Sequence, residues 1–115
     1  MVNNKVNEWK KSLLTSNETL TRAIEVLNES GLGIALVVNK NKHLEGTITD
    51  GDIRRALLRQ IGMNDSLTDV MQVNPVTALT THNRIEILEL MKSNGLLQIP
   101  LLDSNGCVVG LETLQ

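Results

Sequence analysis

The sequence contains almost no aromatic residues: it has no Phe and no Tyr, and Trp9 is its one aromatic ring. A site that holds a planar ligand must therefore use aliphatic side chains and backbone amides rather than ring stacking. Cys107 is the single cysteine, which excludes an intramolecular disulfide and a cysteine-rich zinc site. Basic residues are not in excess, since 11 Lys and Arg stand against 13 Asp and Glu. This balance argues against a general nucleic-acid-binding surface.

Long hydrophobic runs are also missing. Residues 1–10 are polar, so no secretory signal is visible, and no run approaches the roughly 18 apolar residues of a membrane span. We therefore expect a cytoplasmic protein with no membrane partner. The 115 residues are 41% apolar, which suffices for a hydrophobic core without disulfides or a structural metal.

The chain contains an internal repeat with an offset of 64 residues. Residues 16–51 align without gaps on residues 80–115, and six of these 36 positions are identical. The identical pairs are Glu25 with Glu89, Gly31 with Gly95, Leu32 with Leu96, Asn41 with Asn105, Gly46 with Gly110, and Thr49 with Thr113. The shared glycines and threonine fall at the same predicted joints, which favours a duplication over a chance match of two similar units.

Each copy has the pattern of a helix followed by two strands. Apolar residues spaced i, i+3, i+4 and i+7 from Leu20 to Leu27 predict the first helix, which Gly31 would end in the left-handed conformation. An N-terminal helix carrying Trp9 is expected to dock on the core. The other predicted elements are strands at 34–38, 44–49, 97–102 and 107–112, helices at about 50–60 and 83–93, a short helix begun by Ser66, and an extended piece at 76–78.

These elements divide the chain into four parts. We expect an N-terminal arm at 1–14, a first repeat at 15–62, a linker at 63–72 and a second repeat at 73–115. The counterpart of Asp52 in the second copy would be residue 116, so the closing helix of the first repeat has no partner within the sequence. This gap predicts that the protein continues beyond Gln115.

Three stretches resemble a known family: the run at 46–55 (GTITDGDIRR), the run at 98–103 (QIPLLD) and Asn-Pro-Val-Thr at 74–77. Together with the repeat, they are similar to a tandem pair of cystathionine-β-synthase (CBS) domains, often called a Bateman module, over roughly residues 10–115. The resemblance implies an α/β fold of two quasi-symmetric repeats, each a three-stranded sheet flanked by helices. It also implies a nucleotide cleft between the repeats.

The resemblance further implies a regulatory module, with no catalytic residues and no required cofactor, that binds AMP, ADP or ATP. A catalytic domain would follow in the same chain, and the module would form a homodimer. Residues 32–38 and 108–112 are most similar to N-terminal modules of bacterial sugar-1-phosphate nucleotidyltransferases. Residues 49–55 are also similar to sugar-phosphate isomerases of the arabinose-5-phosphate type, in which the pair is C-terminal. A third hypothesis is a scaffold that dimerises its parent enzyme with an empty cleft.

Thr49 and Asp52 are the leading candidate binding residues. A Thr at a strand end and an Asp three residues later bring a hydroxyl and a carboxylate together, and a carboxylate can accept both hydroxyls of a ribose. The adjoining helix N-terminus offers amide donors to a phosphate. The alternative is a capping box, with Thr at the N-cap and an acid at N3; capping and binding can coexist.

Further candidates surround this pair. Arg54 and Arg55 are suited to phosphate oxygens, the alternative being a solvated helix face, and by resemblance Gly33, Ile34 and Ala35 would border the base. By resemblance, the walls of a second, weaker nucleotide site are Pro75, Val76, Thr77, Gln98, Ile99, Pro100 and Thr113. That site departs from the family pattern, because Leu114 replaces Asp50 and Glu112 stands where the first copy has Ile48.

The remaining reactive residue types are isolated in the sequence. His43 and His82 are expected at the surface, and Cys107 is expected to fill space within a strand. No metal site is predicted.

Overall fold

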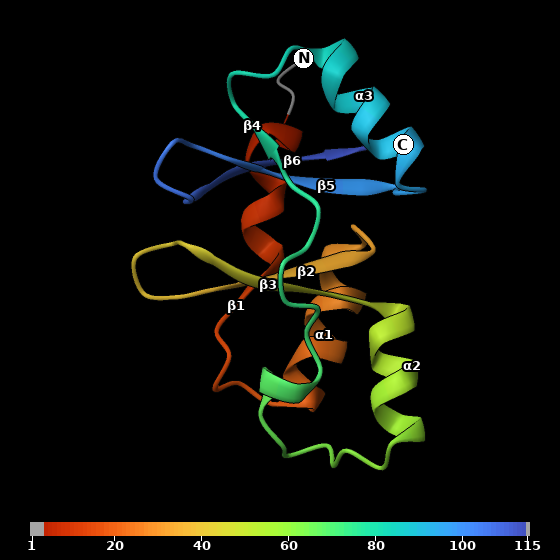
Figure 1. The fold of residues 1–115 in the computed structure, drawn as a ribbon. Coiled ribbons are helices and arrows are strands. Elements are labelled where there is room, and N and C mark those ends of the chain that lie inside the picture. Colours follow the sequence, from red (N-terminus) through yellow and green to blue (C-terminus); the bar gives the residue numbers. More distant parts are fainter. Residues whose placement is uncertain (1–3, 115) are drawn as a thin grey trace.

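Both copies of the sequence repeat fold into a three-stranded sheet, covered on one face by two α-helices in the first copy and by one in the described part of the second (Figure 1). The computed structural model describes residues 4–114. Its elements are η1 (Asn4–Ser12), β1 (Leu13–Leu14), α1 (Leu20–Ser30), β2 (Ile34–Val38), β3 (Leu44–Thr49), α2 (Asp50–Leu58), η2 (Leu67–Asp69), β4 (Ala78–Leu79), α3 (Arg84–Ser93), β5 (Gln98–Leu102) and β6 (Val108–Thr113). This architecture confirms the predicted α/β fold class.

The two sheets have the same topology and the same irregularity. Their orders are β1-β2-β3 and β4-β5-β6, with the first pair of strands parallel and the second antiparallel. The register shifts between Val37 and Val38 in one sheet and between Leu101 and Leu102 in the other, again 64 residues apart. Both α1 and α3 are followed by a left-handed glycine, Gly31 and Gly95. The repeat in sequence is therefore a repeat in structure.

Strand boundaries differ slightly from those that periodicity predicted. Leu13 and Leu14, expected in the N-terminal arm, form β1 and pair with Leu36 and Val37. A two-residue strand carries no period of its own, so only the neighbouring strand identifies it. The last strand begins one residue later than predicted and ends at Thr113.

The sheets stack face to face, with α1 and α2 outside the first sheet and α3 outside the second (Figure 1). Strand β2 is buried on both faces. Its Ala35 and Val37 pack into the core beneath α1 and α2. Its alternate residues Ile34, Leu36 and Val38 pack with Val108 of the other repeat between the sheets. Burial on both faces explains why β2 is continuously apolar rather than alternating.

The two hairpins meet at a pseudo-twofold axis. The Leu44 amide donates to the Gly106 carbonyl over 3.2 Å, and the Val108 amide donates to the Lys42 carbonyl over 3.0 Å. The two bonds are equivalent, because the 64-residue offset relates Leu44 to Val108 and Lys42 to Gly106. His43 and Cys107 pair across the axis and are both half-buried, so neither lies fully at the surface. The repeats are thus joined by main-chain bonds as well as by side-chain packing.

Two equivalent positions of the repeats, 64 residues apart, are apolar in the first repeat and charged in the second. Leu20 and Ile48 are fully buried in the first core. Their counterparts, Arg84 and Glu112, instead form an ion pair with an N–O distance of 2.7 Å. Across the part of the chain that the structure describes, no helix has the length and apolar character needed to cross a membrane.

Candidate functional site

A cavity of about 290 Å³ lies between the two repeats. Its size is close to the lower end of small-molecule pockets, roughly 300–1,000 Å³. Residues from β2, β3, α2, β5, the segment 72–76 before β4 and the turn before β5 line it: Ile34, Thr47, Thr49, Asp52, Arg55, Gln72, Asn74, Pro75, Val76, Leu96, Gln98 and Pro100. We call this cavity the inter-repeat cleft.

The polar end of the cleft is built around Asp52. Its Oδ2 accepts from the backbone amide of Thr49 at 2.9 Å and from the Thr49 hydroxyl at 3.1 Å. This arrangement is a capping box at the start of α2, so the capping interpretation of the Thr49–Asp52 pair is correct. Asp52 is only 8% exposed. The box therefore fixes a nearly buried carboxylate against the cleft.

Arg55 neutralises the other oxygen of this carboxylate. Its Nη2 donates to Asp52 Oδ1 over 2.8 Å, while 66% of the Arg55 side chain is exposed. A carboxylate has about four acceptor positions, and these bonds use three. An adjoining hollow of about 420 Å³ shares Asp52, Arg55 and Gln72 with the cleft and reaches Arg59. This hollow carries two arginines, Arg55 and Arg59, together with Asp52 and Asp69.

The opposite wall is aliphatic and carries side-chain amides. Ile34, Leu96 and Pro100 supply apolar surface, and Gln72, Asn74 and Gln98 supply amides. The linker is held in place because the Gln72 and Thr47 backbones exchange two hydrogen bonds, of 2.8 and 3.1 Å. Such a wall accepts a flat apolar face without ring stacking, as the scarcity of aromatics requires.

The close approach of the linker to β3 depends on Gly46. A Cβ built there would lie 2.8 Å from the carbonyl oxygen of Gln72. A larger residue would force this linker, and with it one wall of the cleft, away from β3.

The structure brings together residues that the sequence analysis assigned to two separate sites. From the first set, Thr49, Asp52, Ile34 and Arg55 line the inter-repeat cleft. From the second set, Pro75, Val76, Gln98 and Pro100 line the same cleft. The two sets meet because the segment before β4 and strand β5 reach the side of the first repeat that carries Thr49 and Asp52.

The other predicted site residues are absent from the cleft lining. Ala35 and Ile99 are fully buried in the cores of their own repeats. Arg54 lines a separate hollow between α1 and α2. Thr113 pairs with Gln98 at the end of β6, and Thr77 and Gly33 lie beside lining residues. Arg54 and Arg55 are therefore not equivalent, since successive residues of a helix point in different directions.

Sequence reasoning did not single out Thr47, Gln72 and Leu96 as site residues. Thr47 lies two residues before Thr49 on the same strand, and strand alternation places both on one face. Thr47 could therefore have been predicted from the strand period. The position of Gln72 could not be predicted, because it depends on pairing with Thr47 across 25 residues of chain.

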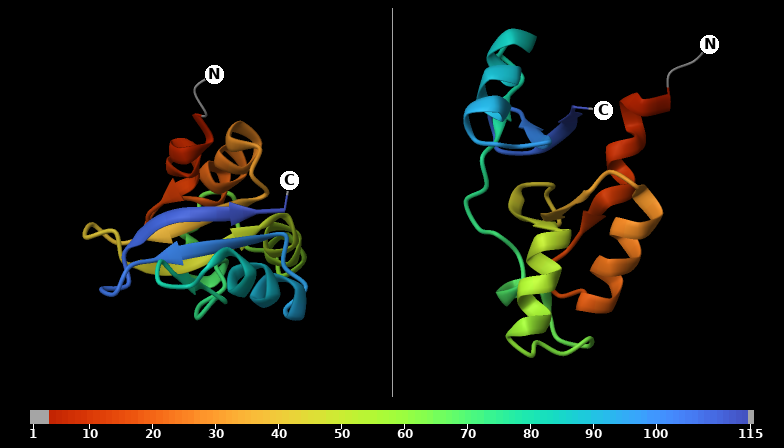
Figure 2. Two further views of the ribbon diagram at one scale, coloured as in Figure 1. Left: turned by 90° about the horizontal axis from the view of Figure 1, so that it is seen from above. Right: turned by 90° about the vertical axis from the view of Figure 1, so that its right-hand side faces the viewer.

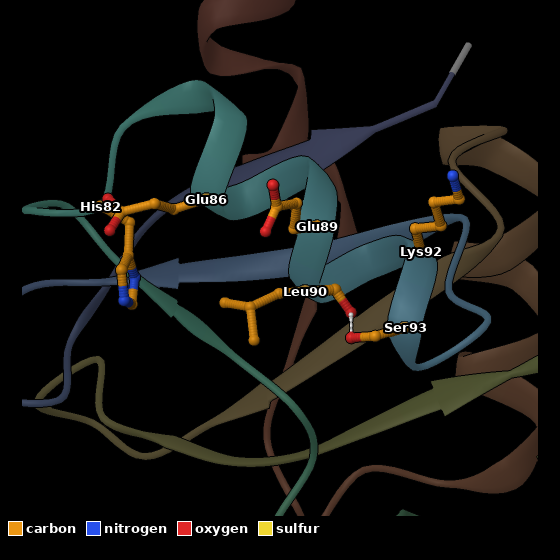
Figure 3. A pocket seen from close by; sticks show the side chains of 6 residues that line it. All are labelled: His82, Glu86, Glu89, Leu90, Lys92 and Ser93. Atoms are coloured by element: carbon orange, nitrogen blue, oxygen red, sulfur yellow. Dashed lines mark hydrogen bonds between the residues drawn. The ribbon is translucent and has the colours of Figure 1, made fainter.

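A hollow of about 690 Å³ lies elsewhere, along the outer flank of α3 (Figure 3). The side chains of His82, Glu86, Glu89 and Lys92 spread along this flank and do not point toward a common centre. His82 and Glu86 accept hydrogen bonds from local backbone amides. Among the residues that the structure describes, no group of three or more His, Cys, Asp or Glu could hold a metal ion.

The fold and cleft together define a tandem domain pair with a ligand-sized cavity between its halves. The CBS domain family matches residues 13–59 and 67–111, nearly the whole chain. The chain therefore belongs to the CBS domain family and contains two copies of the domain. The first matched range includes β1, and the second runs from η2 into β6.

Several curated relatives are longer proteins. An uncharacterised protein of Rickettsia prowazekii is 33% identical over 99 residues, which are 86% of this chain and 30% of that protein. The arabinose 5-phosphate isomerase KdsD of Pseudomonas aeruginosa is 33% identical over 93 residues, with coverages of 80% and 28%. GutQ of Escherichia coli, also an arabinose 5-phosphate isomerase, is 28% identical over 89 residues, with coverages of 77% and 28%. The chain thus spans under a third of these relatives.

Solved structures of similar fold include nucleotide complexes. A CBS domain protein from Pyrobaculum aerophilum complexed with AMP has a TM-score of 0.79 at 19% identity, covering 89% of this chain and 79% of that one. A CBS domain pair in complex with 5′-methylthioadenosine and S-adenosyl-L-methionine has a TM-score of 0.77 at 24% identity, with coverages of 88% and 79%. At these identities the likeness establishes the fold.

Proposed function

We propose that the inter-repeat cleft binds an adenosine nucleotide and that the chain is the regulatory module of a larger enzyme. One observation carries the proposal: the Thr49–Asp52 pair and Arg55 stand at one end of a cleft whose other wall is aliphatic and amide-bearing. A ribose hydroxyl binds the remaining acceptor position of Asp52, the phosphate meets Arg55, and the base lies against Ile34. Similar folds complexed with AMP support this assignment.

The groups in the cleft favour binding over catalysis. Its one carboxylate is already engaged by a capping box and an arginine, and neither His43 nor His82 lines the cleft. We therefore assign regulation to this chain and chemistry to the rest of the protein. The isomerase relatives favour a sugar-phosphate isomerase as that enzyme. A nucleotidyltransferase, the first expectation from the resemblance, receives no support from them.

Thermal denaturation with added nucleotides tests the binding proposal. A ligand at about 100 times its dissociation constant stabilises the native state by roughly 2.7 kcal/mol, which for a domain of this size is a rise in Tm of about 10 °C. We expect this shift with AMP, ADP or ATP and a smaller one with GMP or CMP. No shift with any adenosine nucleotide, together with a concentration-dependent dimer in sedimentation, would instead support the scaffold hypothesis.

Gly33→Ala is expected to weaken nucleotide binding through Gln98. A Cβ at residue 33 would lie 2.6 Å from Gln98 Nε2, so the amide must leave its place in the cleft wall. The loss of one neutral hydrogen bond is worth about 0.5–1.5 kcal/mol, which lowers affinity by roughly 2- to 12-fold. Isothermal titration calorimetry with AMP measures this change.

Gly31→Ala is the matched control for this variant. Gly31 and Gly33 both have left-handed backbones, with φ of 65° and 77°, but a Cβ at residue 31 meets nothing within 4 Å. Both variants lose similar stability from backbone strain, and only Gly33→Ala should lose affinity. Equal affinities for the two variants would remove Gln98 from the proposed binding set.

A further inference from the structure

In the part of the chain that the structure describes, three residues other than glycine have a left-handed backbone: Lys42, Gln60 and Asn74, with φ of 71°, 66° and 57°. Lys42 lies in the hairpin turn after β2 and Gln60 follows the end of α2, both common places for this conformation. Asn74 belongs to neither kind of turn, and Pro75 follows it. A proline moves the residue before it toward an extended backbone. The left-handed conformation of Asn74 therefore carries strain.

The repeated fold does not require this conformation. The counterpart of Asn74 in the first repeat is Lys10, which lies within η1 and has no left-handed backbone. The segment 72–76 is instead fixed at both ends: the Gln72 backbone is bonded to Thr47 of the first repeat, and β4, which follows the segment, pairs with β5 of the second. Figure 2 (right) shows this segment, in green, passing from one repeat to the other. Strained residues that the surrounding structure holds in this way cluster at binding sites.

The side chain of Asn74 does not serve the local turn. The carboxamide oxygens of Asn39 and Asn83 accept hydrogen bonds from backbone amides two and three residues later. Within the described residues 4–114, the carboxamide of Asn74 makes no such bond. Asn74 lines the inter-repeat cleft beside Pro75. The donor and the acceptor of its carboxamide are therefore available to a ligand in the cleft.

A carboxamide carries its donor and its acceptor side by side, and this arrangement matches one purine better than the other. Asn bonds bidentately to adenine, whose N6 amino group donates and whose N7 accepts, whereas guanine presents two acceptors, O6 and N7, at that edge. The aliphatic residues of the cleft contact either purine alike. Gln72 and Gln98 also carry amides, but each has one more rotatable bond than Asn74 and loses more entropy when it is fixed on a base.

We propose that Asn74 is the base-selecting residue of the inter-repeat cleft: its carboxamide pairs with N6 and N7 of adenine and disfavours purines that carry an oxygen at position 6. The strained backbone of Asn74 holds the carboxamide in place for this pairing. The inference rests on the proposed function and adds to it the residue that distinguishes adenine from other purines.

Calorimetric titration with AMP and inosine monophosphate (IMP) tests this role, because IMP has an oxygen in place of the N6 amino group. We expect the original protein to bind AMP about tenfold more tightly than IMP. Asn74→Gly removes the carboxamide, and glycine adopts the left-handed backbone without strain, so the variant should fold and bind AMP and IMP with similar affinity. A preference for AMP that is unchanged in Asn74→Gly overturns the proposed role.

Gln60→Gly is the matched control, since Gln60 is exposed, has a similar left-handed backbone and does not line the inter-repeat cleft. It should keep the preference for AMP.

Asn74→Asp provides a second variant of the same size. Asp tolerates a left-handed backbone, but its carboxylate only accepts hydrogen bonds and repels N7, so the affinity for AMP should fall about tenfold. An AMP affinity equal to that of the original protein contradicts the pairing. If the original protein binds neither AMP nor IMP, the proposed function itself is wrong, whereas AMP binding with an unchanged preference in Asn74→Gly removes only the assignment of Asn74.

Discussion

Replacing Asp52 with Asn is expected to lower the affinity for AMP, ADP and ATP about 100-fold. Hydrogen bonds to a charged group are worth about 1.5–3 kcal/mol each, and the Asp52 carboxylate is the one anionic group in the cleft lining. The loss should be similar for the three nucleotides, because they share the ribose and differ in phosphate number. Isothermal titration calorimetry with each nucleotide measures it.

Asp50→Asn provides the matched control, since Asp50 is exposed in the first turn of the same helix and does not line the inter-repeat cleft. Both variants remove one negative charge from the N-terminal turn of α2, so the helix-dipole contribution of about 0.3–1 kcal/mol changes alike. A difference in affinity between them isolates the role of the Asp52 carboxylate. If Asp52→Asn binds AMP as tightly as Asp50→Asn does, the ribose assignment is wrong.

Leu36→Ala should produce the largest loss of stability, with Tm falling by roughly 10–20 °C, since truncating a buried Leu costs about 2–5 kcal/mol. Leu36 is fully buried in the cluster between the sheets. The transition should stay single in calorimetry, because this cluster contains residues of both repeats and couples their unfolding.

Leu58→Ala is the appropriate comparison: Leu58 is 76% exposed at the end of α2, and Ala and Leu are both good helix formers. Its Tm should stay close to that of the original protein. Two separate transitions in the original protein, with Leu36→Ala affecting only the first repeat, would contradict the coupling.

Local pattern was enough to predict most of the helices and strands. The helical period of Leu20 to Leu27, the apolar run at 34–38 and the glycines at 31 and 95 depend on neighbours in sequence. The offset of 64 residues then supplied the second repeat. What pattern could not supply was β1, whose two residues become a strand only by pairing with β2.

The candidate site could be predicted in part. Thr49 and Asp52 form a local capping box, and a spacing of three residues is visible in the sequence. Their grouping with Pro75, Val76, Gln98 and Pro100 could not be predicted, because the family resemblance assigned these residues to a second site. The stacking of the sheets across the pseudo-twofold axis places both sets around one cavity. Arg54 lines a different hollow for a local reason, since helix geometry directs it away from Arg55.

The identity of the larger enzyme was the weakest sequence inference. Resemblance favoured nucleotidyltransferases, whereas two of the three curated relatives described above are arabinose 5-phosphate isomerases. A binding module is a site on a fold, and its sequence reflects the ligand and the core rather than the chemistry of an attached domain. The assignment of the module to the CBS family does not share this weakness, because it rests on residues within the module.

The scarcity of aromatic residues illustrates which features of the site the sequence determines and which only the tertiary structure determines. The sequence by itself determined that a planar ligand must meet aliphatic and amide groups, and that the chain contains two copies of one unit. Only the tertiary structure decided that Ile34, Leu96 and Pro100 converge from both copies on one cleft, and that Trp9 packs against the cluster between the sheets. The reason is physical: composition and period constrain each element separately, whereas a cleft exists only where elements distant in the chain pack together.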